Sequence, residues 1–316
     1  MFIHSRVILA LALALLLGTS QGWTAPIFSE NFEMAPGNVS QGNTQFNTLL
    51  ANGWNGVAAN CTGYCSMSIV PGPFGRGGTV LQYEYRSDQD IEPIPAQDAH
   101  NANLIKVFNP PLSEIWARVD FATDVDTTAS PTALTSQWFC CGTKLHYIKP
   151  AGSGPSYITG SAYPGNSGGG LMSVYAAQEM AVCPQGGTPV YKGGNGCNNI
   201  TPNVTPLVIR DKQWYCVEYH IKLNSSYTMA DGVIEMWING NKVLDLQKQL
   251  MVDGHYTLEN AKIGQIEVYR QHANHMYRYE DNLQWSSSRV GCSGVSPIEP
   301  APAPAKPRSP TGLQVR

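Results

Sequence analysis

Charged side chains are scarce in this chain. Its 316 residues include 20 Lys and Arg and 23 Asp and Glu, which is 14% charged and a formal net charge of −3. A nucleic-acid-binding surface needs Lys and Arg clustered on one face to contact the phosphates. The composition therefore argues against a nucleic-acid partner.

Long apolar runs are also missing, apart from one at the N-terminus. Residues 7–17 are apolar, follow Arg6 and precede the small residues 18–22. This run is too short for a membrane-spanning helix, which needs about 20 residues, and its flanks are typical of a secretory signal peptide. We therefore expect residues 1–24 to be a signal peptide and the mature protein to be secreted or periplasmic, with no membrane span. A retained membrane anchor is the alternative.

No long segment shows a convincing helical period, whereas 31 Gly and 22 Pro indicate many turns. Alternating or strand-like segments recur instead, at residues 27–32, 79–86, 114–122, 143–149, 171–177, 206–210, 263–270 and 276–285. Loops are expected at 34–66, 152–170 and 182–205. This pattern predicts an all-β fold over residues 25–293, a two-sheet antiparallel jelly-roll β-sandwich with long disulfide-bearing loops. Residues 294–316 are proline-rich and are expected to form a disordered tail.

The segment 214–246 has the clearest pattern in the chain. Two stretches alternate polar and apolar residues, and Asn239-Gly240 follows the second one. Asn-Gly supplies the two positive-φ residues of a tight hairpin turn. The segment therefore predicts three consecutive antiparallel strands.

Eight cysteines follow the predicted signal peptide, at positions 61, 65, 140, 141, 183, 197, 216 and 292. An even number of cysteines in an exported chain favours disulfides. Cys61–Cys65 and Cys183–Cys197 are plausible local pairs, but eight cysteines allow 105 connectivities. A thiolate metal site is disfavoured because Cys61-x3-Cys65 has no matching second pair.

Residues 214–246 resemble the back-sheet meander of concanavalin A-like jelly rolls, and the polysaccharide lyase-type members are the most similar. The opening FSENFE, the closing YEDNLQWSS and the pair IWARVDF and TKLHYIK resemble further strands of that family. The Glu-x-Asp-x-Glu signature of jelly-roll glucanases is absent, and so are the Gln-Ile-His and Tyr-Phe-Lys-Ala-Gly signatures of common alginate lyases. The resemblance therefore implies a carbohydrate-associated jelly roll and leaves the chemistry open.

The predicted strands at 114–122 and 143–149 carry a candidate catalytic group. If they share one sheet, their polar sides place Arg118, Lys144 and His146 in one groove that fits an anionic uronate polymer. In a lyase, Arg118 and Lys144 neutralise the uronate carboxylate and His146 takes the C5 proton, because its pKa lies near neutrality. The resemblance implies a tyrosine as the acid, for which Tyr83 is the candidate. Substrate contacts are predicted for Arg86, Tyr277 and Tyr279. A solvated strand face is the competing interpretation of all these residues.

A structural calcium ion is the one cofactor that the sequence indicates. Many jelly rolls of this kind tie their first and last strands together with calcium held by carboxylate and backbone oxygens. Glu30, Glu33 and Asp281 stand at the corresponding ends of this chain. Ordinary surface carboxylates are the alternative.

Two other motifs lack the partners that their chemistry needs. Ser167 lies in a GNSGGG loop like that of chymotrypsin-type proteases, but His100 is too near in sequence and lacks the usual flanks. His272 and His275 have no third metal ligand. We therefore predict a secreted polysaccharide lyase-like enzyme that cleaves an acidic glycan by β-elimination. The alternatives are a non-catalytic carbohydrate-binding or lectin-like module, and a structural surface protein whose groove is filled by residues 150–205.

Overall fold

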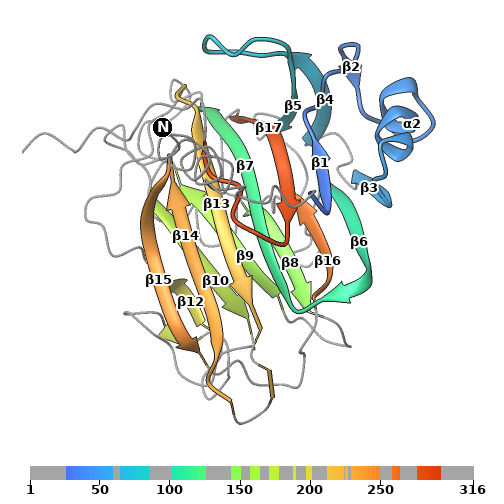
Figure 1. The fold of residues 1–316 in the computed structure, drawn as a ribbon. Helices are drawn as coiled ribbons and strands as arrows, with labels where there is room; N and C mark the ends of the chain where they lie inside the picture. The colour runs from blue at the N-terminus through green and yellow to red at the C-terminus, as the bar shows by residue number, and fades with distance from the viewer. Residues whose placement is uncertain are drawn as a thin grey trace, which may run out of the picture.

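The structure is a computed structural model, and it describes residues 26–59, 65–85, 102–125, 144–150, 157–163, 171–177, 188–189, 197–200, 212–223, 225–226, 229–249, 258–263 and 276–292. These residues form two antiparallel sheets, one of nine strands and one of eight (Figure 1). The chain therefore folds as the two-sheet jelly-roll β-sandwich that the sequence predicted.

The nine-stranded sheet contains the three consecutive strands predicted from residues 214–246. Its order is β15-β14-β13-β7-β17-β5-β4-β2, and β1 also pairs with β17. The strands are β1 (Phe28–Glu30), β2 (Gly37–Asn38), β4 (Cys65–Pro71), β5 (Thr79–Tyr85), β7 (Glu114–Val125), β13 (Tyr215–Lys222), β14 (Gly232–Ile238), β15 (Asn241–Gln249) and β17 (Met276–Ser286). The turn between β14 and β15 has φ of 48° at Asn239 and 82° at Gly240, which confirms the predicted hairpin.

The eight-stranded sheet lies behind the first in Figure 1. Its order is β11-β12-β10-β9-β8-β16-β6-β3. The strands are β3 (Gly56–Ala59), β6 (Ala102–Leu112), β8 (Lys144–Pro150), β9 (Tyr157–Tyr163), β10 (Leu171–Ala177), β11 (Thr188–Pro189), β12 (Cys197–Ile200) and β16 (Leu258–Ile263).

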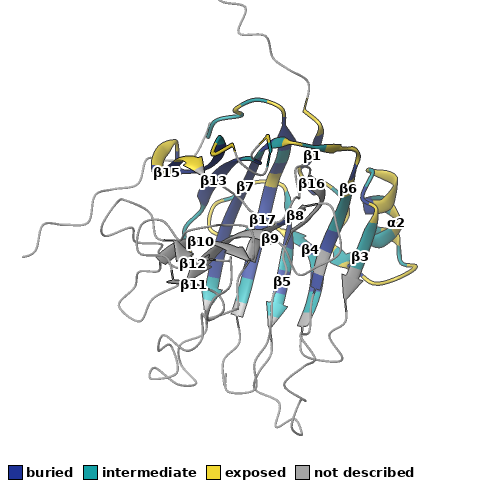
Figure 2. Ribbon diagram, turned by 90° about the horizontal axis from the view of Figure 1, so that it is seen from below, coloured by how far each residue is buried: buried dark blue, intermediate teal, exposed yellow. Residues whose placement is uncertain are grey.

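The hydrophobic core lies between the two sheets. Ala117, Val119 and Phe121 of β7 are fully buried in it, as are Leu104 of β6 and Ile148 of β8 from the opposite sheet. Buried residues recur along β7, β13 and β17 of the nine-stranded sheet (Figure 2). The alternating side chains of β7 lie on the other side of its sheet, which we call the outer face of the nine-stranded sheet.

Regular structure also occurs in segments that the sequence predicted to be loops. Residues 34–66 contain β2, β3 and the short helix α2 (Thr44–Ala51), which begins where the Asn43 side chain accepts a hydrogen bond of 2.9 Å from the Phe46 N–H. Strand β9 lies within 152–170, and β11 and β12 lie within 182–205. The prediction of irregular loops there was wrong. Strands β2, β3, β11 and β12 have at most four residues and are too short to show a period, whereas β9 lies in a segment rich in Gly, Ser and Pro.

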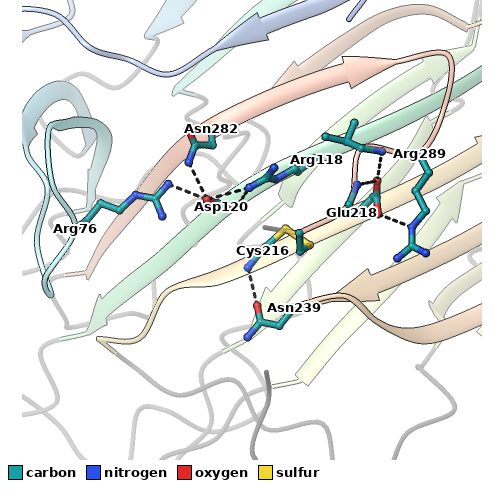
Figure 3. The surroundings of a disulfide bond; sticks show 11 residues. Arg76, Arg118, Asp120, Cys216, Glu218, Asn239, Asn282 and Arg289 are labelled. Carbon is teal, nitrogen blue, oxygen red and sulfur yellow. Dashed lines mark hydrogen bonds and ion pairs between the residues drawn. A yellow bond between two sulfur atoms is a disulfide. The ribbon is translucent and has the colours of Figure 1, made fainter. Parts of the chain in front are cut away.

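A disulfide fixes the C-terminal end of the described chain to the outer face of the nine-stranded sheet. Cys216 of β13 is bonded to Cys292, 76 residues away. We call residues 287–292 the closing segment. Its Val290 and Gly291 N–H groups donate to Glu218 of β13 at 2.7 and 2.9 Å. Carboxylate bonds and the disulfide therefore hold the same segment, as Figure 3 shows.

Several predictions fall outside the described residues. They are the signal peptide, the tail, Arg86, the motifs at His100, Ser167, His272 and His275, and the strand at 206–210. The same holds for the Cys61–Cys65 and Cys183–Cys197 pairs, of which Cys61 and Cys183 are not described. Among the described residues, no helix is long and apolar enough to cross a membrane.

Candidate functional site

Arg118 does not lie in the same sheet as Lys144 and His146. Arg118 belongs to β7 of the nine-stranded sheet, and the other two belong to β8 of the eight-stranded sheet. Arg118 also lies on the outer face, because its neighbours Ala117 and Val119 point into the core. The prediction that these strands share one groove was wrong: a period-2 pattern fixes which residues share a face but does not say which sheet a strand joins.

Strand β8 occupies the middle of the eight-stranded sheet, between β9 and β16. Of its residues, the structure describes only the side chain of Ile148, which is buried in the core. The pairing of β8 with β9 shifts register between positions 144 and 146, so these two positions do not follow one unbroken alternation. His146 as the base and Lys144 as the uronate-binding cation stay predictions.

Tyr83, the predicted acid, lies in the core of the sandwich. It is fully buried and belongs to the main core cluster. The Arg278 guanidinium of the neighbouring strand β17 lies 4.6 Å from the centre of its ring. Tyr83 therefore packs beneath a buried cation, on the side of the sheet opposite to Arg118.

Arg278 and Glu280 place an ion pair inside the sandwich. Both side chains are fully buried, and Nε of Arg278 lies 3.0 Å from Oε1 of Glu280. Neither Glu280 oxygen has a hydrogen-bond partner among the described residues. Burial raises the pKa of Glu280 to about 7, although the charge of Arg278 opposes the shift. The negative charge of Glu280 also adds to burial in raising the pKa of Tyr219.

Glu280 is expected to make the protein less stable as the pH rises from about 4.5 to about 7. Its carboxyl group binds a proton more tightly in the folded state than in the unfolded state. The protonated group therefore contributes its full stabilisation below the unfolded pKa of 4.5, and this stabilisation is lost as the pH rises through the folded pKa of about 7. The shift corresponds to roughly 3 kcal/mol. Urea unfolding between pH 5 and 8 should therefore show a smaller loss of stability in Glu280→Gln than in the wild type. Glu84→Gln, which changes a carboxylate on a neighbouring strand, should retain the wild-type pH dependence.

A second charged cluster lies on the outer face, where Arg76 contacts two carboxylates. Figure 3 shows its contact with Asp120. Its guanidinium lies 2.7 Å from Asp120 of β7 and 2.6 Å from Asp281 of β17. Burial raises the pKa of Asp281, and Arg76 opposes that shift. Burial also tends to lower the pKa of Arg76, but its bonds to the two carboxylates outweigh this and raise it. Arg76 thus serves as the cation that joins the β4–β5 loop, β7 and β17.

These contacts do not fit the calcium ligands that the sequence indicated. Asp281 is paired with Arg76, and Glu30 accepts hydrogen bonds from the Phe32 N–H, the Asn52 amide and the Trp54 indole at 2.9, 3.0 and 3.3 Å. Glu33 accepts a bond of 3.1 Å from the Thr79 N–H. No cluster of three or more His, Cys, Asp or Glu in the described part of the chain has the geometry for a metal ion. In this structure protein groups contact all three carboxylates, and calcium and its ligands stay predictions.

Tyr277 and Tyr279 lie together on β17, with ring centres 6.2 Å apart. The Tyr279 hydroxyl accepts a hydrogen bond of 3.3 Å from Gln82, and Phe74 packs edge-on against its ring at 5.6 Å. Tyr279 is buried, whereas Tyr277 is partly exposed. Their predicted contact with substrate stays a prediction.

The polar residues of β13 form contacts that their alternation did not reveal. His220 lies between Glu114 and Glu235, 2.6 Å from each, and stacks on Trp116 with ring centres 4.0 Å apart. Glu218 is fully buried, although its alternation with apolar residues is typical of a solvent-facing position. The closing segment covers it, and nothing in the local sequence pattern of β13 indicates that cover.

The comparisons with known proteins identify the fold. No protein-family model matches the chain, and no curated protein sequence matches it. Among solved structures, the fold is similar to that of the alginate lyase Aly36B, with a TM-score of 0.54 and 15% identity, over 83% of this chain and 97% of that one. An endo-β-1,4-glucuronan lyase from the fungus Trichoderma reesei has a TM-score of 0.52 and 11% identity, over 84% and 96%. An alginate lyase from a Chlorella virus has a TM-score of 0.52 and 13% identity, over 79% and 98%. The chain therefore has a jelly-roll fold of the polysaccharide lyase type.

Proposed function

We propose that this protein is a polysaccharide lyase that cleaves an acidic, uronate-containing glycan by β-elimination. The observation that carries the proposal is the fold, which is shared over nearly the full length of lyases named for alginate and glucuronan. Fold similarity alone does not define a reaction, so residues of this chain must supply the chemistry.

Strand β8 is the element that we propose to carry that chemistry, because its sequence KLHYIKP places cations, a histidine and a tyrosine on one strand in the middle of a sheet. In β-elimination a base removes the C5 proton, a cation stabilises the charge that develops on the carboxylate, and the C4–O bond breaks as the C4–C5 double bond forms. An acid protonates the departing oxygen. We assign the base to His146 and the cation to Lys144, and Tyr147 and Lys149 of the same strand are the competing pair.

The experiment is an ultraviolet assay for the unsaturated uronate product on alginate, glucuronan and other uronate polymers. His146→Ala should lower kcat by about 100-fold or more if His146 is the base, since general base catalysis contributes that much. Tyr147→Phe and Lys149→Met test the competing pair in the same assay. His220→Asn is the matched control, because it removes a histidine from the other sheet.

The absence of product on every polymer would refute the lyase proposal. Activity that survives His146→Ala but not Tyr147→Phe would retain the reaction and move the base to Tyr147.

A carbohydrate-binding module without catalysis is the second candidate. The partly exposed ring of Tyr277, which lies beside that of Tyr279, favours it, because ligand sites are commonly lined by aromatic side chains. Binding of a polymer with no unsaturated product would support this candidate over the enzyme.

We also infer that the protein is exported. The Cys216–Cys292 disulfide fits an oxidising compartment, which agrees with the predicted signal peptide. Edman sequencing of the secreted protein tests this inference, because cleavage of the predicted signal should give a mature N-terminus between residues 21 and 26.

A further inference from the structure

A polar pocket lies on the nine-stranded sheet, where β1, β17, β7 and the end of α2 meet. Its volume is ≈ 590 Å³, within the range of pockets that bind small ligands. It is lined by Ser29, Glu30, Asn31, Asn52, Arg118, Asn282, Leu283 and Gln284. Strand β8 belongs to the other sheet, so the lyase proposal does not use this pocket.

A β-bulge in β17 shapes the pocket. Asp281 pairs with Asp120 and Gln284 pairs with Arg118, so β17 carries one extra residue over this interval. The extra residue is Asn282, which has a φ of 48°, a conformation that non-glycine residues rarely adopt. Such strained positions are concentrated at ligand sites. After the bulge, Gln284 lies beside Arg118 on the outer face.

Arg118 has an unsatisfied hydrogen-bond donor at this place. Arg118 is 8% exposed, and one terminal nitrogen of its guanidinium lies 3.2 Å from Asp120. Its Nε is buried and has no hydrogen-bond partner among the described residues. Arg118 lines the pocket, and its described hydrogen bonds are those of one terminal nitrogen with Asp120, so an acceptor bound in the pocket adds a bond to a charged group that is only partly satisfied. A carboxylate is the acceptor that matches guanidinium geometry best.

The two acidic residues near Arg118 already have partners. Asp120 accepts bonds from Arg76 at 2.7 Å and from the Asn282 amide at 3.0 Å. Both oxygens of Glu30 are bonded to N–H groups of the protein. The remaining polar lining consists of amides and a hydroxyl, which are groups that bind sugar hydroxyls. The pocket therefore combines one cation and the hydrogen-bonded carboxylate of Glu30 with neutral hydrogen-bonding groups.

We propose that this pocket binds a single uronate residue, with Arg118 on its carboxylate and Gln284 and Asn31 on its hydroxyl groups. The site lies on the sheet opposite to the proposed catalytic strand, and it gives the protein a second contact with an acidic glycan. The ligand class follows from the lining of the pocket and does not depend on the lyase reaction.

The test is a titration of the ¹⁵N-labelled protein with the monosaccharide glucuronate, observed at the tryptophan indole signals. Trp54 reports on the pocket, because its indole N–H donates to Glu30 in the pocket wall. We expect glucuronate to shift the Trp54 signal, and glucose and acetate each to bind about tenfold more weakly, because each lacks half of the contacts. A monosaccharide has no glycosidic bond to cleave, so a failed lyase assay leaves this test intact.

Two pocket variants and one control decide the result. Gln284→Glu adds a negative charge beside Arg118 and should weaken glucuronate binding by about tenfold or more without opening the core. Arg118→Gln should do the same, whereas Arg289→Gln, which removes a cation elsewhere on the same face, should leave the Trp54 response unchanged. No Trp54 shift with glucuronate, or the same shift in Gln284→Glu, would overturn the proposal. Equal affinities for glucose or for acetate would overturn the assignment of a uronate.

Discussion

Replacing Arg76 with methionine is expected to lower the free energy of unfolding by about 3–5 kcal/mol, as the loss of one partner from a buried charge cluster commonly does. The variant leaves Asp120 and Asp281 without the cation that lies 2.7 and 2.6 Å from them. These carboxylates are paired across adjacent strands, and their side chains are only 1% and 6% exposed. Their two negative charges repel each other, and water screens this repulsion little because both side chains are buried. Urea unfolding at neutral pH measures the loss.

A double-mutant cycle separates the charge effect from the loss of packing. Asp281→Asn removes one of the two negative charges and preserves the side-chain shape, so it should offset part of the damage in Arg76→Met. Arg76→Lys keeps the positive charge but contacts both carboxylates less well, and should lose less stability than Arg76→Met. If the effects of Arg76→Met and Asp281→Asn simply add, the carboxylate contacts do not account for the stability of this cluster.

The same variants test the calcium prediction. Because Arg76 occupies the position between the carboxylates, we expect the wild type to have the same Tm in calcium and in a chelator. A lower Tm in the chelator would show that calcium binds elsewhere in the chain. In Arg76→Met the freed carboxylates become available, so a gain in Tm from added calcium is expected only in that variant.

The sequence predicted the faces of the strands much better than the sheets that they join. Alternation placed Ala117 and Val119 opposite Arg118, and the structure confirms this arrangement. Period 2 is a local property of one strand, so it is visible in one sequence. Whether β7 and β8 share a sheet depends on pairings between residues far apart in the chain, and no local pattern records them.

Buried polar groups were the other feature that the sequence concealed. Glu218 and Asp120 alternate with apolar residues in the way that solvent-facing residues do, yet both are buried. They are buried because the closing segment and the β4–β5 loop cross the outer face and supply donors from distant parts of the chain. For Arg118 the sequence concealed the polar pocket that this residue lines. The pocket depends on the bulge at Asn282, and no motif in YEDNLQWSS indicates that bulge.

The disulfide of the closing segment should contribute about 4 kcal/mol to stability, because it closes a loop with a sequence separation of 76 residues. The double variant Cys216→Ala/Cys292→Ala removes the cross-link without leaving a free thiol. The loop between the two cysteines contains β14, β15 and β17 of the nine-stranded sheet and β16 of the eight-stranded sheet, so the unfolded chain gains freedom over this whole segment. Urea unfolding of the oxidised wild type and of the double variant gives the difference.

Amide hydrogen exchange then tests whether the disulfide stabilises the protein by restricting the unfolded chain or by holding the closing segment in the folded state. In the folded state Glu218 still accepts bonds from the Val290 and Gly291 N–H groups, and Arg289 pairs with it at 3.0 Å, so the closing segment has a second attachment. If the disulfide acts mainly on the unfolded chain, both amides stay protected in the double variant up to the lowered global stability.

Glu218→Gln is the matched change, because it keeps the cross-link and weakens only the charge-assisted bonds, and it should reduce protection locally at these amides. Loss of their protection in the cysteine variant with a change in stability below about 1 kcal/mol would contradict the unfolded-state account, since the disulfide would then act only as a local clamp.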